Sequence, residues 1–232
     1  MESIEYTKMA YLYDKFYINK DYSKEVNFIK SFTTNNAKIL DAGCGTGNHA
    51  KILHNLGYDV IGFDKSKDMI DIANTKIENH FFVDDVLSFH YKEKFDLIIS
   101  FFAVFNHLKN YKDFKLALSN LKSSLKDNGV IIIDLHNPQK NGQKKEVADN
   151  AIRIMKWRNR SLTKKEFSQI TYIVDDKIYK TKHCFKIFSI KKLYLIAKEL
   201  GFTNIGFYEN YNNSTTATKR SKNIQMVLNK SI

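Results

Sequence analysis

The sequence is poor in cysteine and has no long apolar run. Two cysteines, Cys44 and Cys184, occur among 232 residues, too few for a disulfide framework and not arranged as a CxxC pair. This usage is typical of a reducing compartment, so we expect a cytoplasmic protein. No run of about 18 apolar residues is present, so we expect no membrane partner. Residues 1–17 lack the apolar segment of a signal peptide.

Arginine is also scarce, although the chain is strongly basic. The formal net charge is +12, from 37 lysines and arginines against 25 aspartates and glutamates, but only four of the basic residues are arginine. Arginine is the side chain preferred for bidentate contacts with phosphate and bases, and here the lysines are spread along the whole chain. The charge therefore favours a solvated lysine surface over a nucleic-acid interface.

The chain does contain the alternating strand and helix patterns of a globular protein. Hydrophobic residues make up 43% of it, enough to bury a core. From Lys38 onward, unbroken apolar runs alternate with helical patterns, which is typical of parallel strands covered on both faces. The strands expected in this part span residues 38–43, 59–64, 80–85, 95–100 and 130–135.

Helix signals separate these strands. One predicted helix ends at Gly57, a suitable C′ residue, and another begins after Ser66, a suitable N-cap. A third carries apolar residues from Phe114 to Leu125 and is closed by the sequence DNG. Residues 1–36 are expected to form an N-terminal helical cap.

The pattern changes after the fifth expected strand. Residues 137–150 have the character of a loop, and residues 151–188 read as three strands of an antiparallel insertion with a hairpin turn at DDK. A helix beginning after Ser189 and two further strands complete the sheet. We therefore predict one α/β domain over residues 1–232, with a seven-stranded, mostly parallel sheet, a helical cap and an antiparallel β lid.

The stretch LDAGCGTG, from Leu40 to Gly47, gives the strongest functional signal. A strand that enters a glycine loop and leaves through a helix N-terminus lets a ligand approach the backbone closely. A dinucleotide site requires G-x-G-x-x-G, but Asn48 stands where its last glycine would be. The pattern D-x-G-x-G-x-G instead resembles motif I of class I S-adenosylmethionine (SAM)-dependent methyltransferases.

This resemblance implies a Rossmann-like fold and SAM as the cofactor. It implies that Asp64 binds the ribose hydroxyls and that Asp85, in preference to Asp84, faces the adenine amino group. Phe101 and Phe102, after the fourth strand, would lie beneath the cofactor or belong to the core. The full set of cofactor-binding residues predicted in this way is Tyr13, Asp41, Gly43, Cys44, Gly45, Gly47, Asp64, Lys65, Met69, Asp85, Val86 and Phe101.

Less specific features of the sequence indicate the kind of acceptor. The segment YDKFY, from Tyr13 to Tyr17, and the lid insertion are similar to the sugar-nucleotide N-methyltransferases of deoxyaminosugar biosynthesis. That resemblance implies that Tyr13 lies over the cofactor and Tyr17 at the mouth of the pocket. The reaction would be methyl transfer to a small-molecule acceptor, such as the amino group of a nucleotide-linked amino sugar.

Positions after the fourth and fifth strands supply the remaining acceptor-side candidates. Asn106 and His136 are predicted to face the substrate, and His107 is the candidate catalytic residue because it could orient the acceptor or take its proton. Asn137 is a weaker candidate, and His49 is expected to pack beside the cofactor loop. An amine acceptor needs only to arrive neutral, whereas a hydroxyl acceptor needs a base. No metal is expected.

Several alternatives remain open at this point. One is O-methylation of a sugar or another small metabolite, another is RNA methylation, and a third is SAM binding without catalysis. The only proline is Pro138, so the Pro-Pro-aromatic motif of base amino-methyltransferases is absent. A nicotinamide oxidoreductase is a more distant alternative, and the sequence leaves open whether the protein is a homodimer.

Overall fold

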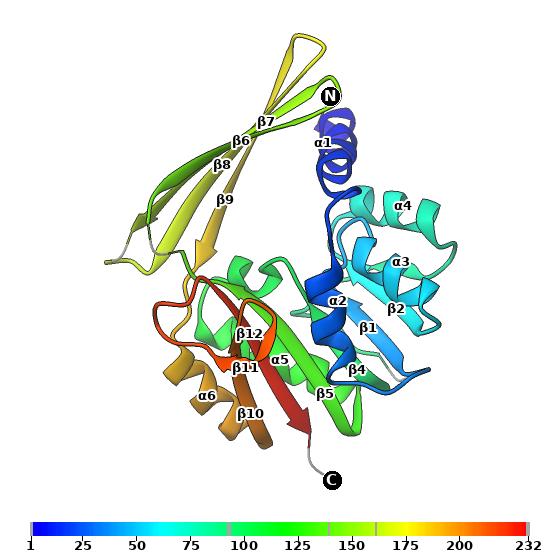
Figure 1. The fold of residues 1–232 in the computed structure, drawn as a ribbon, viewed down its shortest axis with the longest axis vertical. Coiled ribbons are helices and arrows are strands. Elements are labelled where there is room, and N and C mark those ends of the chain that lie inside the picture. The colour runs from blue at the N-terminus through cyan, green and yellow to red at the C-terminus, as the bar shows by residue number, and fades with distance from the viewer. Residues whose placement is uncertain (1, 92–93, 139, 161, 231–232) are drawn as a thin grey trace.

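The computed structural model describes residues 2–91, 94–138, 140–160 and 162–230. It contains a large mixed sheet flanked by helices and a separate antiparallel sheet that extends away from it (Figure 1). The strand order of the large sheet is β11-β10-β12-β5-β4-β1-β2-β3. This confirms the predicted α/β class with a mostly parallel, Rossmann-like sheet.

The parallel part of the sheet follows the expected strands closely. It comprises β1 (Lys38–Ala42), β2 (Asp59–Asp64), β3 (Phe81–Val83), β4 (Phe95–Ser100) and β5 (Leu125–His136). The strands β10 (Phe202–Glu209) and β12 (Asn223–Lys230) pair antiparallel beside β5. All the parallel strands end at the same edge, which is where ligands bind in open α/β sheets.

The sheet has an eighth strand that the sequence did not reveal. The strand β11 (Asn212–Thr216) pairs with β10 at the edge of the sheet, after a turn in which Asn210 and Tyr211 have φ values of 54° and 59°. Its residues, NNSTT, are polar and all exposed. A strand without a buried face carries no alternation of apolar residues, so periodicity could not find it.

Helices cover both faces of the sheet. On one face, α5 (Tyr111–Ser123) and α6 (Ile190–Glu199) pack on Ile131 and Ile133. On the other, α2 (Ser23–Lys30), α3 (Asn48–Asn55) and α4 (Lys67–Lys76) pack on the alternate residue Ile132. Alternation along β5 thus supplies two cores from one strand.

The capping signals predicted at Ser66 and Gly57 are confirmed. Ser66 accepts the Met69 amide at 3.4 Å as the N-cap of α4, and Gly57 has φ +90° just after α3. The helix predicted to reach Leu125 was too long. Ser123 ends α5, and Leu125 begins β5, where it pairs with Phe95 and is fully buried.

The lid is larger than predicted. Its four antiparallel strands are β6 (Gly142–Ala148), β7 (Ala151–Arg160), β8 (Lys165–Val174) and β9 (Lys177–Lys186). The interpretation of residues 137–150 as a loop, with the lid beginning at residue 151, was wrong. The sequence of β6, GQKKEVA, is mainly polar and exposed because β6 is an edge strand.

The N-terminal cap bridges the two sheets. The helix α1 (Glu2–Tyr17) passes between the lid and α4, and α2 then turns back onto the main sheet (Figure 1). Leu12 of α1 is buried against Ala151, Tyr172 and Val174 of the lid. Within the described residues, no helix is long and apolar enough to cross a membrane.

Candidate active site

The glycine loop joins the end of β1 to the start of α3. Gly43, Gly45 and Gly47 all have positive φ, at +79°, +54° and +76°. A Cβ at Gly43 would lie 2.6 Å from Val104, and one at Gly47 would lie 2.9 Å from Phe81. A Cβ at Gly45 would meet nothing within 4 Å. The outer glycines therefore allow close packing, whereas the middle one borders open space that a ligand can approach.

The loop is fixed to β2 by its backbone. The amides of Gly43 and Cys44 both donate to the Phe63 carbonyl, at 2.8 and 2.9 Å. Burial, followed by the nearby carboxylates, raises the pKa of the Cys44 thiol well above its usual value. The thiol therefore stays protonated at neutral pH, which agrees with a packing residue and not with a nucleophile.

Asp64 lies directly beside the open middle of the loop. Its Oδ2 accepts the Gly45 amide at 3.0 Å, and its Oδ1 accepts the Ser66 amide at 2.9 Å. Burial raises the pKa of this carboxyl, although both hydrogen bonds act in the opposite direction. The predicted ribose-binding acid thus sits at the end of β2, next to the one glycine of this loop that faces free space.

Asp41 is buried without full compensation. Asp41 is the last residue but one of β1, and only 2% of its surface is exposed. Its Oδ2 has no hydrogen-bond partner among the described residues. Burial, and then the Asp64 charge, raises the pKa of Asp41 to about 7. A buried, unpaired carboxylate is costly, so this position is suited to a cationic partner.

The acids after β3 form a tight turn. The strand ends at Val83, so Asp85 lies beyond it and not at its end as predicted. Asp84 accepts the Asp85 amide at 2.7 Å, and Asp85 accepts the Leu87 amide at 2.9 Å. Val86 is buried next to this turn. Both carboxylates thus shape the backbone, and the preference for Asp85 stays a prediction.

Two other predicted cofactor residues follow β2: Lys65 lies in the connection to α4, and Met69 lies on α4 itself. Lys65 is exposed, and Met69 is half-buried in the first turn of α4. Burial lowers the pKa values of His107 and His183, and the charge of Lys65 adds to this lowering in both. Lys65 directly follows Asp64 in the chain, and its charge also acts on that carboxyl.

The loop after β4 is strained and aromatic. Phe102 and Ala103 have φ values of 58° and 60°, which are unfavourable for residues with a side chain. The Phe102 amide donates to Oδ2 of the buried Asp134 at 3.2 Å, which holds the turn in place. No pattern in the sequence indicates this role, because Asp134 lies within the fifth expected strand, far along the chain from Phe102.

An aromatic cluster surrounds His49. Its ring lies 4.8 Å from that of Tyr22, 5.2 Å from Phe101 and 5.1 Å from Phe102, measured between centroids. Burial lowers the pKa of His49 to about 3, and its Nε2 has no partner among the described residues. His49 is thus a neutral packing residue next to the glycine loop, as expected.

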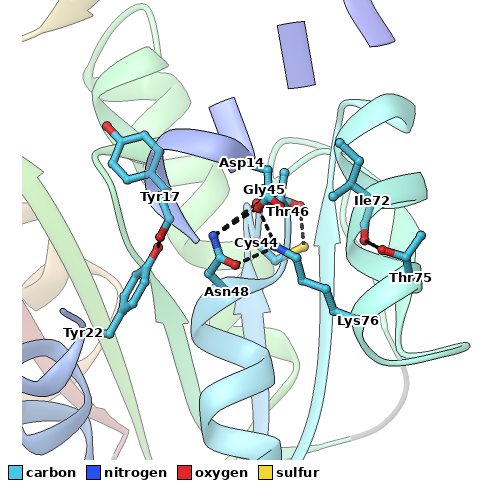
Figure 2. Close-up of polar contacts among 10 residues, drawn as sticks. All are labelled: Asp14, Tyr17, Tyr22, Cys44, Gly45, Thr46, Asn48, Ile72, Thr75 and Lys76. Atoms are coloured by element: carbon cyan, nitrogen blue, oxygen red, sulfur yellow. Dashed lines mark hydrogen bonds and ion pairs between the residues drawn. The ribbon is translucent and has the colours of Figure 1, made fainter. Parts of the chain in front are cut away.

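The N-terminal helix is joined to the glycine loop by a polar network (Figure 2). Asp14 accepts hydrogen bonds from Thr46 at 2.6 Å and Asn48 at 3.3 Å, and it pairs with Lys76 at 2.5 Å. Lys76 also donates to the Asn48 side chain at 2.6 Å. Sequence reasoning missed Asp14, and its place inside YDKFY was the only available signal.

Tyr13 and Tyr17 lie on the same helix, α1, on either side of Asp14 in the sequence. Their ring centroids are 4.5 Å apart, and Tyr17 lies 5.4 Å from Phe102. The Tyr22 hydroxyl donates to the Tyr17 carbonyl at 3.1 Å (Figure 2). The Arg153 guanidinium of β7 stacks 4.5 Å from the Tyr17 ring. Tyr17 therefore contacts both the loop after β4 and the lid.

The candidate residues on the acceptor side divide into two kinds. Asn106 is almost fully buried and donates to the His136 carbonyl at 3.0 Å and the Lys186 carbonyl at 2.7 Å. It also accepts the His136 amide at 2.8 Å. Both of its amide donors are used in this way, so Asn106 joins β5 to the lid and does not face open space. Asn137 is likewise bound to the backbone of Ser221 at 2.7 Å.

His107 and His136 both place their rings near Phe185 of the lid. The His107 ring lies 4.7 Å from Phe185 and 5.7 Å from His183 of β9. Burial, followed by His183 and Lys65, lowers the pKa of His107 to about 4, even though part of its surface is exposed. The His136 ring centroid lies 6.2 Å from that of Phe185. The lid thus brings a third histidine, His183, to this place.

Comparison with known proteins identifies the class. A family model described as "Methyltransferase domain" matches residues 13–206, which include the glycine loop, the following acids and the lid. The chain belongs to this family and is a SAM-dependent methyltransferase. Solved structures that share this fold include methyltransferases described as SAM-dependent or SAM-bound.

Individual relatives agree with this assignment. An uncharacterised protein from Methanocaldococcus jannaschii is 32% identical over 200 residues, which cover 85% of this chain and 74% of that protein. A dTDP-3-amino-3,4,6-trideoxy-alpha-D-glucopyranose N,N-dimethyltransferase from Streptomyces venezuelae is 27% identical, over 54% of this chain and 56% of that enzyme. The crystal structure of a SAM-dependent methyltransferase from Clostridium acetobutylicum shares the fold, with a TM-score of 0.81 at 22% identity, over 98% of this chain and 99% of that one.

Proposed function

We propose that this enzyme transfers the methyl group of SAM to the amino group of a small molecule and releases S-adenosylhomocysteine. A nucleotide-linked amino sugar is the acceptor that the sugar N,N-dimethyltransferase relative favours. The observation that carries the proposal is the cover over the glycine loop. Asp14 binds that loop, while Tyr17, on the same helix, contacts both Phe102 and Arg153. A site closed by a helix and a lid favours a small acceptor over a polymer.

The residues around the glycine loop fit SAM. When bound, SAM supplies an electrophilic methyl group on a positively charged sulfonium. Asp64 would bind the ribose hydroxyls beside the open Gly45, and Asp85 would face the adenine amino group. Asp41, which is buried and incompletely paired, would compensate the positive charge of the methionine moiety.

The chain's own contribution to the reaction is mainly positioning and exclusion of water. The strained turn at Phe102 and the ring of Tyr13 offer aromatic faces, which attract cations and so suit a sulfonium or an ammonium group. The α1 helix and the lid would hold the acceptor in line and keep water away. His107, with its pKa near 4, is neutral at physiological pH but is a weak base. A weak base suits an amine better than a hydroxyl acceptor.

Two measurements test this proposal. Calorimetry should show binding of SAM and no binding of NAD. The purified enzyme should then form S-adenosylhomocysteine with dTDP-linked amino sugars but not with the matching sugars that carry a hydroxyl at the same position. Preference for the hydroxyl sugars would establish O-methylation instead. Turnover with RNA alone would overturn the small-molecule assignment, and SAM binding without turnover on any of these acceptors would argue against an enzyme of this kind.

A further inference from the structure

Glu166 is a carboxylate buried on the inner face of the lid. It belongs to β8 and pairs in register with Phe185 of β9 and Asn159 of β7. Directly paired residues of neighbouring strands project to the same face of a sheet, so Glu166 and Phe185 share the face that meets β5. Only 2% of the Glu166 surface is exposed. An ionised carboxylate in such a place requires a polar or cationic partner.

That partner is His136. The Nε2 atom of His136 lies 3.4 Å from Oε2 of Glu166. The backbone of His136 is fixed on both sides by Asn106, while 37% of the His136 side chain remains exposed. Among the described residues, no hydrogen bond to Nδ1 of His136 is present. One ring nitrogen therefore faces a buried acid, and the other is available to a ligand.

The pair lies at the ligand-binding edge of the sheet. His136 ends β5, which runs parallel to β4, and β4 runs parallel to β1. The carboxyl ends of these strands carry His136, the Phe102 turn and the glycine loop, respectively. The pair is therefore on the same edge as the proposed cofactor site, on the side of the sheet toward the lid.

A carboxylate behind an imidazole is the arrangement that makes histidine an effective proton acceptor. The acid holds the ring with Nε2 protonated, leaves the Nδ1 lone pair free and stabilises the imidazolium that forms. A negative charge at this position also attracts a cation. Most alkyl amines are protonated at neutral pH, and a protonated amine has no lone pair with which to attack a methyl group.

We propose that His136 takes the proton from the protonated amine acceptor and that Glu166 is the positioning residue for His136. The inference rests on the proposed function, because it specifies an acceptor that arrives as an ammonium ion. The acceptor N–H bond breaks, the proton binds Nδ1, and its electron pair remains on nitrogen. The neutral amine then forms the N–C bond as the C–S bond breaks with its electrons on sulfur.

The surroundings favour His136 over His107 for this task. The His107 ring lies 5.7 Å from that of His183, and no carboxylate contact to it is present among the described residues. Burial, followed by His183 and Lys65, lowers the pKa of His107 and so opposes its protonation. The other carboxylate near His136 is Asp134, whose oxygens accept the Phe102 amide and the Gln225 amide. Among the described groups, Glu166 is therefore the acid that faces the His136 ring directly.

The test compares Glu166→Gln, His136→Gln and the double variant with the wild type, using SAM and a dTDP-linked amino sugar. Glu199→Gln is the matched control, because Glu199 forms an exposed pair with Lys115 far from this site. We expect each single variant to lower kcat by at least about 10-fold. The kcat of the double variant should lie within about 2-fold of that of the less active single variant. The affinity for SAM should stay within about 2-fold of wild type in all of them.

The pH profile separates a proton-transfer role from a structural one. Loss of the Glu166 charge destabilises the imidazolium, so Glu166→Gln should move the acid limb of the kcat profile to lower pH, and His136→Gln should remove that limb. A fall in kcat that is uniform at every pH, or an unchanged kcat, would overturn the proposal. Because the His136 ring is partly exposed, His136→Gln keeps the test valid if Glu166→Gln does not fold.

A second readout needs no turnover. In histidine-labelled protein, Glu166→Gln should shift the imidazole resonances of His136 and leave those of His54 and His80 unchanged, and unshifted His136 resonances would overturn the pair. Failure of the proposed function has a different signature, which is a wild-type enzyme that binds no SAM or methylates no amine. If the wild type is active and the variants have the same kcat and pH profile, only the roles of Glu166 and His136 are rejected.

Discussion

Asp14 and Lys76 form an ion pair at 2.5 Å in which only 13% and 8% of the two side chains are exposed. The pair joins α1 to α4 directly above the glycine loop, and both residues also bind Asn48 (Figure 2). The N-terminal helix therefore does more than cover the site, because its carboxylate fixes the first residue of the helix that follows the loop.

Removing Asp14 should weaken both the fold and the cofactor site. In Asp14→Ala, Lys76 keeps only its bond to Asn48, so we expect a loss of about 2 kcal/mol in the free energy of unfolding. The affinity for SAM should fall by at least about 5-fold, since Thr46 and Asn48 lose their anchor. Urea denaturation and calorimetry measure the two effects.

A matched control lies on α4, the helix that carries Lys76. Lys67 and Asp71 form an exposed pair on α4, so Lys67→Ala should change stability by less than about 0.5 kcal/mol. Asp14→Ala combined with Lys76→Met should recover part of the lost stability, because no unpaired charge remains buried. If Asp14→Ala were as mild as Lys67→Ala, the network would not anchor the loop.

The pKa of Asp41 predicts a specific pH dependence. Burial raises it from 3.8 to about 7, so the native state holds a proton that the unfolded state has lost between these values. The stability contributed by Asp41 is therefore complete below about pH 4 and is lost as the pH rises to about 7.

Asp41→Asn removes this penalty. Relative to wild type, the variant should gain stability progressively between pH 4 and 7, by about 4 kcal/mol at most, and then stay level. It should bind SAM more weakly, because the amide cannot compensate a cation. Denaturation of both proteins at several pH values tests the difference, and a gap that does not grow with pH would contradict the assignment.

His107 discriminates between amine and hydroxyl acceptors. With its pKa lowered to about 4, His107 stays neutral from about pH 5.5 upward and should add no limb to the activity profile there. For an amine acceptor, His107→Ala should keep kcat within about 5-fold of wild type, whereas a hydroxyl acceptor would suffer a loss of at least about 100-fold. His183→Ala, which changes the neighbouring ring, is the control for loss of packing.

The sequence predicted those parts of the site that depend on local conformation. The glycines at 43, 45 and 47 and the N-cap Ser66 are dictated by their own backbone geometry, so their pattern can be read directly. Strands buried on both faces were also readable from their apolar runs. Edge strands such as β6 and β11 were not, because they have no fully buried face.

The residues that were missed act across long distances in the chain. Asp14 binds Thr46 and Lys76, and Asp134 binds the Phe102 amide. An aspartate in an amphipathic helix or at the end of an apolar strand looks ordinary in the sequence. Its role depends on which distant element packs against it, and only the assembled fold determines that.

The anchoring of Phe102 by Asp134 gives the last prediction. Asp134 accepts hydrogen bonds from the Phe102 amide at 3.2 Å and from Gln225 at 3.0 Å, and its interaction with the Tyr211 hydroxyl adds a third. In Asp134→Asn one oxygen becomes an NH₂ group, which must face one of these donors. We expect a loss of about 1–3 kcal/mol in the free energy of unfolding.

Catalysis should suffer more than stability alone explains. Phe102 and Ala103 occupy strained conformations that persist only while the surroundings enforce them. With the anchor weakened, the Phe102 ring should move away from Tyr17, and we expect the KM for the acceptor to rise while the affinity for SAM changes little. Tyr211→Phe is the control, because it removes one donor and leaves the Phe102 bond intact. Equal kinetic effects in both variants would show that Asp134 stabilises the fold without positioning Phe102.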